Sequence, residues 1–154
     1  MDIMGPLHVT LTGRKYALVM IDLLTRYVEV FALRDQMVNT IAKVFVTKII
    51  MRYGCPRQLL TGRGTNFISQ LMKEVCTLFG AKQVQTTAYH SQANGAIGAI
   101  QNYWDQLIPY VVFAYNTTSH TSTGETPFFL MYGRDPEIPM EDILVLKEDF
   151  LFSG

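Results

Sequence analysis

Few side chains in this sequence are placed for chemistry, and each has an ordinary structural interpretation. Taken alone, Asp2 is a solvated acid near the beginning of the chain. Asp22 follows an apolar stretch and begins a tight turn, which is the usual place for a turn or capping acid. The segment Gly62–Gly64 is only a weak match to a phosphate-binding loop, because a lone Gly-x-Gly recurs by chance. These residues become informative only through the longer strings that contain them.

Cysteine and histidine chemistry is not indicated by the spacing of these residues. Cys55 and Cys76 form no CxxC pair, and two cysteines do not make a disulfide framework. His8 and His120 have no partner at a spacing typical of metal ligands. The asparagine of the string Asn116–Thr118 matches a glycosylation motif, which we interpret as a chance match.

Length and charge restrict the class of protein. The 154 residues, 49% of them hydrophobic and 17% charged, make about one domain with a packed core. Thirteen Lys and Arg balance thirteen Asp and Glu, so net charge gives no reason to expect nucleic-acid or membrane binding. The longest apolar runs, such as Tyr16–Ile21, are far shorter than the roughly 18 residues of a membrane span. Without a visible secretory signal, we expect a soluble intracellular α/β domain with no membrane partner.

Apolar periodicity predicts the elements that position the polar residues. Strands are predicted over Ile3–Val9, Tyr16–Ile21, Tyr27–Leu33, Gln58–Leu60 and Gln83–Thr87. The first is interrupted by Gly5 and Pro6, so it should be an edge strand or a broken one. Helices are predicted from Gln36 to Gly54, from a cap at Thr65 or Asn66 to Gly80, and over Trp104–Tyr115 with Pro109 inside. Residues 89–98 are predicted to be a loop. Three strands followed by alternating helices and strands predict a mixed sheet flanked by helices, the element order of ribonuclease-H-like domains.

Several longer strings form a more specific pattern than any single residue. They are Met1–Leu7, Tyr16–Val30, Tyr53–Thr61, Gly64–Phe67, Thr87–Gly95, Phe113–His120 and Thr126–Arg134. Together they resemble the integrase catalytic core of long-terminal-repeat retrotransposons, close to the gypsy type. The resemblance covers a domain over residues 1–144 and leaves 145–154 as a tail.

The resemblance implies a ribonuclease-H-like fold and a role in DNA integration by phosphodiester transfer. Cores of this family hold divalent cations, normally Mg²⁺, between two Asp and one Glu. Two cations can stabilise both the attacking and the leaving oxygen of an in-line displacement, and carboxylates are the hard ligands that Mg²⁺ prefers. Asp2 aligns with the first carboxylate, so the resemblance implies that Asp2 is both a catalytic residue and a metal ligand.

The same resemblance implies a set of DNA contacts. Asn66 matches a family position near DNA, although it is equally suited to cap the following helix. The matching substrate loop would contact DNA through Tyr89, His90, Gln92 and Asn94. Since the basic residues are scattered and balanced by acids, we expect DNA binding to be weak and salt-sensitive. We also expect a nuclear location.

The sequence departs from the family at the two other carboxylates. Gly62 stands where the second should be, and Gly98 stands near the third, which was either substituted there or deleted. Only residues 99–103 separate Gly98 from Trp104, so one family helix is largely missing. Asp22 is the only candidate for a substitute ligand. Losing outer-shell support alone costs about 10–100-fold in affinity or activity. We therefore predict no productive Mg²⁺ binding and a catalytically inactive domain.

Two alternatives remain open from the sequence alone. The chain can be a non-enzymatic protein-interaction or dimerisation module, because the apolar stripe beginning at Trp104 suits either a core or a homodimer interface. It can also be a non-functional fragment of a decayed element, as the missing helix suggests.

Overall fold

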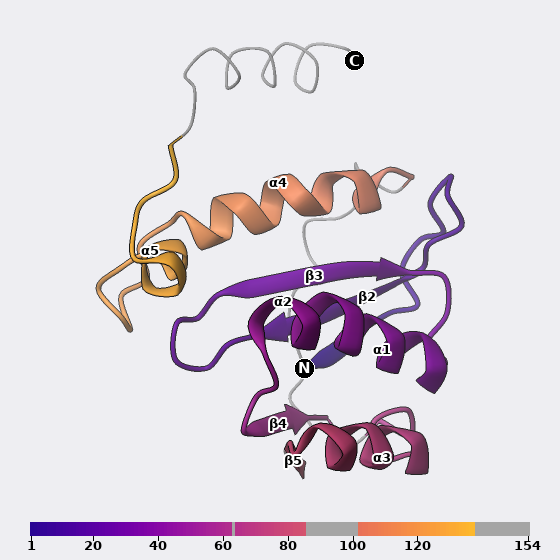
Figure 1. Ribbon diagram of the computed structural model, residues 1–154. Helices are drawn as coiled ribbons and strands as arrows, with labels where there is room; N and C mark the ends of the chain where they lie inside the picture. Colours follow the sequence, from indigo (N-terminus) through magenta and orange to yellow (C-terminus); the bar gives the residue numbers. More distant parts are fainter. Residues whose placement is uncertain (63, 86–101, 138–154) are drawn as a thin grey trace.

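The computed structural model describes residues 1–62, 64–85 and 102–137, which form two small sheets with helices packed around them (Figure 1). The first sheet is antiparallel, in the order β1 (Asp2–Met4), β2 (Tyr16–Ile21), β3 (Val28–Leu33). The second pairs β4 (Gln58–Thr61) in parallel with β5 (Lys82–Gln85). The Met1 ammonium group donates a 2.7 Å hydrogen bond to the Leu60 carbonyl, so β1 lies next to β4 where the sheets meet.

The helices follow in the predicted order. One helical segment after β3 comprises α1 (Val38–Val44), the π-helical η1 (Phe45–Ile50) and α2 (Met51–Tyr53). It ends at Gly54, whose φ of 86° suits glycine. The others are α3 (Gln70–Phe79), α4 (Trp104–Asn116, with Pro109 inside) and α5 (Pro127–Tyr132). None of the helices within the described residues is long and apolar enough to cross a membrane.

The first strand is broken at Gly5 and Pro6, as the sequence predicts: it stops at Met4, because proline has no N–H for a ladder. Two local predictions need correction. The cap of α3 is neither Thr65 nor Asn66. Instead the Ser69 hydroxyl accepts a 3.3 Å hydrogen bond from the Met72 amide, and residues 64–67 form a turn. Helix α5 was not predicted, because six residues are too few to show a period.

The core lies between α1, η1, α3 and the sheets. Its most buried members include Leu18, Ile41, Phe45 and Met72, each no more than 1% exposed. On β2 the neighbouring residues Ala17 and Leu18 are both buried, which confirms that this strand is covered on both faces.

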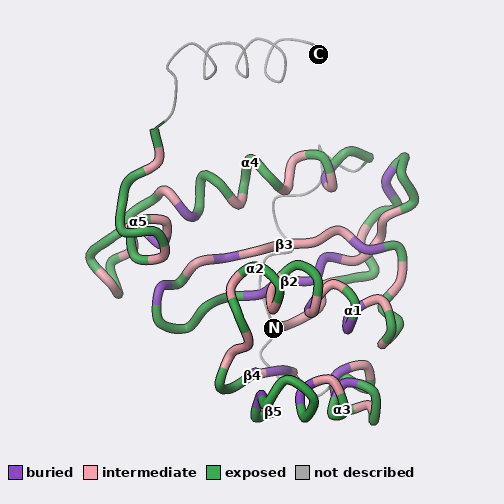
Figure 2. The backbone as a smooth tube through the Cα atoms, viewed as in Figure 1, coloured by how far each residue is buried: buried purple, intermediate pink, exposed green. Residues whose placement is uncertain are grey.

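Helix α4 contributes less to the core than its periodicity predicts. Only its two end residues, Trp104 and Asn116, are buried, and Figure 2 shows most of the helix exposed or half-buried. Val111 is 65% exposed. Of the predicted stripe only Trp104 is buried, and its indole N–H donates a 2.7 Å hydrogen bond to the His8 carbonyl.

Asn116 fixes the other end of α4 to the edge of the sheet. Its Oδ1 accepts from the Val28 N–H and its Nδ2 donates to the Val28 carbonyl, both at 2.9 Å. These are the two hydrogen bonds that a neighbouring strand would make with Val28. At 2% exposure, the Asn116 side chain is a structural element of the fold.

Candidate active site

The structure brings together the first two positions at which the resemblance implies carboxylates. Asp2 lies on β1, and Gly62 directly follows β4, the strand next to β1. A Cβ atom added to Gly62 would lie 3.3 Å from Oδ1 of Asp2. A side chain at position 62 would therefore project against the Asp2 carboxylate, at a range where two acids could share a cation.

Asp2 has a modest set of contacts of its own. Its side chain is half-buried, and Oδ1 accepts a 2.9 Å hydrogen bond from the Ile3 amide. Within residues 1–62, 64–85 and 102–137, no group of three or more His, Cys, Asp or Glu side chains is placed to hold a metal ion.

The distribution of acids along the sequence explains this result. The sequence contains no Asp or Glu between Asp35 and Glu74, and none between Glu74 and Asp105. The first interval contains β4 and Gly62, and the second contains β5 and Gly98. No acid thus stands at or near either position where the resemblance implies a further carboxylate.

Asp22 does not serve as a substitute ligand in this structure. Its Oδ1 accepts hydrogen bonds from the amides of Leu24 (3.1 Å) and Thr25 (2.7 Å) and from the Thr25 hydroxyl (2.9 Å). This is the geometry of an acid that stabilises its own turn. The structure supports the turn interpretation that the sequence favours.

The residues present do not fit a pair of magnesium ions. Mg²⁺ requires near-octahedral oxygen ligands and gives up water reluctantly. Glycine offers no side-chain ligand at position 62, which leaves Asp2 as the only carboxylate of this pair of positions. We therefore derive no metal-dependent step for this site.

Asn66 lies on the loop that follows Gly62, and its role as a helix cap is excluded by Ser69. Its Nδ2 donates a 3.3 Å hydrogen bond to Oε1 of Gln36, just before α1. Asn66 is half-buried and Gln36 is exposed, so this amide pair lies at the surface. Sequence reasoning did not identify Gln36, because nothing in the sequence links positions thirty residues apart.

Gln83 on β5 holds the same loop from its other side. Its Nε2 donates to the Phe67 carbonyl at 2.6 Å and to the Thr61 hydroxyl at 3.3 Å. The backbone on either side of Gly62 is thus fixed by contacts that need no metal. The predicted DNA contacts Tyr89, His90, Gln92 and Asn94, together with Gly98, lie outside the described residues.

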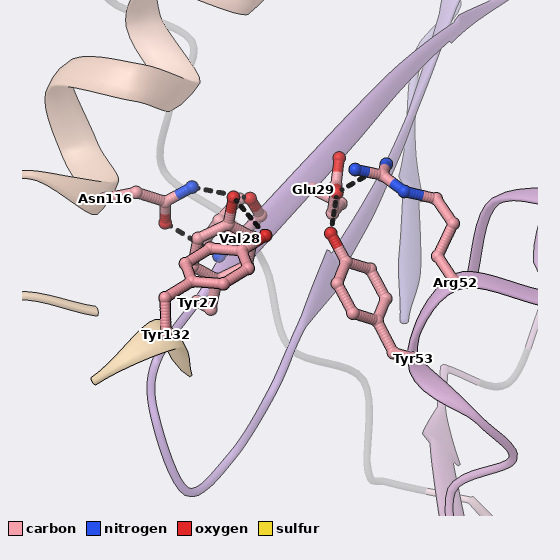
Figure 3. A network of polar contacts seen from close by, with 7 residues as sticks. All are labelled: Tyr27, Val28, Glu29, Arg52, Tyr53, Asn116 and Tyr132. Carbon is pink, nitrogen blue, oxygen red and sulfur yellow. Dashed lines mark hydrogen bonds and ion pairs between the residues drawn. The ribbon is translucent and has the colours of Figure 1, made fainter. Parts of the chain in front are cut away.

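A second polar cluster joins β3, α2 and α5 (Figure 3). Glu29, whose side chain is 16% exposed, pairs with Arg52 at 3.0 Å and accepts a 2.5 Å hydrogen bond from the Tyr53 hydroxyl. Burial, followed by the hydrogen bond to Glu29, raises the pKa of Tyr53. Tyr27 contacts both Tyr53 and Tyr132 edge-to-face, at centroid distances of 6.4 and 5.6 Å. The cluster stabilises the fold and contains one acid, so it is no alternative metal site.

Comparisons with known proteins agree on one family. The model of the "Integrase core domain" family matches residues 1–91. "Gypsy retrotransposon integrase-like protein 1" of Bos taurus is 32% identical over 152 residues, covering 90% of this chain and 30% of that protein. "Retrovirus-related Pol polyprotein from transposon 412" of Drosophila melanogaster is 27% identical over 153 residues, covering 90% of this chain and 12% of the polyprotein.

A solved structure confirms the predicted ribonuclease-H-like fold. The catalytic core domain of BIV integrase superposes with a TM-score of 0.63 at 14% identity, covering 86% of this chain and 92% of that domain. A chain from the simian T-cell lymphotropic virus intasome in complex with PP2A regulatory subunit B56 gamma gives a TM-score of 0.59 at 16% identity, over 81% of this chain and 52% of that chain. This chain spans at most about 30% of the length of the curated relatives described above.

Proposed function

Because this chain belongs to the integrase core domain family and is of retrotransposon origin, we propose that it is a core without strand-transfer activity. One observation carries the proposal. Gly62 occupies the position from which a side chain would meet Asp2 at 3.3 Å, and it offers no ligand there. The absence of acids between Glu74 and Asp105 removes the third carboxylate in the same way.

The proposed lack of activity follows from the ligands that two Mg²⁺ ions require. Two-metal phosphoryl transfer needs cations on both the attacking and the leaving oxygen. A single carboxylate does not compensate the cost of dehydrating two Mg²⁺ ions held close together. The chain keeps the first two positions of the site side by side but lacks two of its three ligands.

A Mg²⁺- or Mn²⁺-dependent nicking and strand-transfer assay on labelled duplex DNA tests the proposal directly. The purified chain should give no product above background, and Asp2→Ala should give the same result. Metal-dependent turnover that disappears in Asp2→Ala would show that the site is active.

A pair of variants at position 62 tests the geometry separately from activity. Gly62→Asp should bind Tb³⁺ or Mn²⁺ at least about tenfold more tightly than the unaltered chain, because the new carboxylate would share the ion with Asp2. Gly62→Ala adds the Cβ without a ligand and should not change metal affinity. Equal metal affinity of both variants would contradict the placement of residue 62 beside Asp2. Strand transfer should stay absent in both, since the third carboxylate is missing.

We further propose weak, salt-sensitive DNA binding in the nucleus, where an integrase core meets its substrate. Support comes from the integrase names of the relatives and from the exposed position of the Asn66–Gln36 pair. Gel shifts at increasing salt should show affinity falling steeply. Asn66→Ala should weaken binding, whereas Asn39→Ala, an exposed asparagine on α1, should not.

Self-association into a homodimer is a further proposal for this core. The outward face of α4 exposes Val111 (65%) and, one turn further along the helix, Tyr115 (39%), and exposed apolar side chains gathered on one face mark a surface for a partner. Sedimentation should show a dimer that Val111→Lys dissociates, with Thr118→Lys, at an exposed position just after α4, as the control. A monomer at every concentration would exclude the dimer.

Neither a module without an integrase role nor a decayed fragment gains support from the comparisons.

A further inference from the structure

A groove runs along the free edge of β3, between α4 and the helical segment that contains η1. The cavity, of about 360 Å³, is lined by the four consecutive residues Val30–Leu33, by Val44 and Lys48, and by Ile108 on α4. Consecutive strand residues point to opposite faces of a sheet. A cavity that contacts four of them in a row must therefore lie beside the strand edge.

The backbone groups on this edge are only partly paired. The Asp22 amide donates to the Tyr27 carbonyl at 2.9 Å, so by alternation Val28, Val30 and Ala32 turn their backbone groups away from β2. Asn116 takes both groups of Val28, and the Arg14 guanidinium donates to the Ala32 carbonyl. The N–H and C=O of Val30, between these two blocked positions, have no partner in the described part of the chain.

An unpaired acceptor lies on the opposite wall. Oδ2 of Asp105 accepts hydrogen bonds from the hydroxyls of Thr10 (3.1 Å) and Thr12. Oδ1 of the same carboxylate is buried and has no partner among the described residues. Pro109, four residues further along α4, has no N–H to offer the Asp105 carbonyl. A buried charged acceptor without a donor is unfavourable, so this wall selects a group that donates hydrogen bonds.

We propose that this groove binds an extended peptide that carries a single basic side chain. Its main chain would pair with the Val30 N–H and C=O, and its ammonium or guanidinium group would donate to Oδ1 of Asp105. An extended peptide offers a donor and an acceptor together, as strand addition to a sheet edge requires. Val44 and Ile108 provide apolar walls for the neighbouring side chains.

The charges around the groove restrict the peptide further. Lys48 and Arg14 also line it, and Lys48 is exposed at the surface. These two cations repel additional positive charge, so a peptide with one basic residue should bind more tightly than a polybasic one. The same charges favour a peptide with an acidic residue outside the position that faces Asp105.

The test uses the full chain and a short fluorescein-labelled peptide of alternating Val and Thr with one central Lys. Fluorescence anisotropy should show saturable binding. Replacing the central Lys by Glu, or Asp105 by Asn, should weaken it about tenfold, because a charge-assisted hydrogen bond is lost. Asp135→Asn, at an exposed acid away from the groove, should leave the affinity unchanged. Circular dichroism of Asp105→Asn should match that of the unaltered chain, which would show that the variant is folded.

Two further measurements do not depend on a variant. N-methylation of the amides flanking the central Lys should weaken binding about fivefold or more, because main-chain donors are lost. Hydrogen exchange at the Val30 amide should slow when the peptide binds. The proposal is overturned if N-methylation leaves the affinity unchanged, or if millimolar peptide shows no saturable binding. It is also overturned if Val30 becomes protected with protein concentration alone, since a second copy would then fill the groove.

Discussion

Removing the Asn116 side chain should be among the most damaging single changes in this domain. Asn116 is 2% exposed, and Val28, whose N–H and C=O it pairs, is 8% exposed. Asn116→Ala leaves both backbone groups buried without partners. Each unpaired group costs about 1–3 kcal/mol, so the pair should cost about 2–6 kcal/mol.

That loss is a large share of the typical stability of a domain, which is about 5–15 kcal/mol. For a chain of this length it corresponds to a decrease in Tm of roughly 4–24 °C. Urea unfolding followed by fluorescence measures it directly, because the single tryptophan, Trp104, is buried on the same helix. Asn102→Ala is the matched control. Its side chain makes one exposed hydrogen bond, to His8, and should cost less than about 0.5 kcal/mol.

Asn116→Asp separates the two hydrogen bonds. The carboxylate still accepts from the Val28 N–H but cannot donate to the Val28 carbonyl. Because burial favours the neutral acid, the protonated form should return at mildly acidic pH and donate again. The difference in stability from the unaltered protein should therefore shrink as the pH falls. Equal stability of Asn116→Ala and Asn102→Ala would refute this account of the sheet edge.

The other predictions concern local contacts. The pKa of Tyr53 is raised above its ordinary value of 10.0. The contribution of Tyr53 to folding stability should therefore be complete below pH 10.0 and be lost as the pH rises toward the raised pKa. Urea unfolding across the alkaline range should show a shallower pH dependence of stability in Tyr53→Phe. Ser69→Ala should cost about 1 kcal/mol in the same assay, because the Met72 amide loses its cap, whereas Thr65→Ala should cost little. Trp104→Phe should cost about 1–2 kcal/mol and speed hydrogen exchange around residues 8–12, because the bond to the His8 carbonyl is lost.

Apolar periodicity predicted the bounds of an element well where neighbouring elements of this chain cover its apolar residues. The bounds of β2 were predicted without error, since six apolar residues between polar ones leave little choice. The start of α3 was wrong because Thr65, Asn66 and Ser69 are all suitable caps, and only tertiary contacts select Ser69. For α4, the apolar period shows that the helix has an apolar face, but it does not show whether other parts of this chain cover that face.

The candidate site could be predicted in part. The resemblance gave the alignment of Asp2 and Gly62, and the structure confirms that the two are neighbours. Contacts between distant segments left no local signal. Asn116 and Val28 are 88 residues apart. In the sequence, Asn116 stands out only as part of a glycosylation motif, which does not indicate its structural role. The tyrosine cluster escaped prediction for the same reason.

The glycine beside Asp2 also has a thermodynamic consequence for the fold. An active core must hold several carboxylates at close range, and like charges at that range repel until a cation neutralises them. This electrostatic frustration is a common way in which a site for chemistry weakens the fold around it. With no acid at position 62, this repulsion is absent between β1, which carries Asp2, and the end of β4. The Tm of the domain should accordingly be the same with and without Mg²⁺.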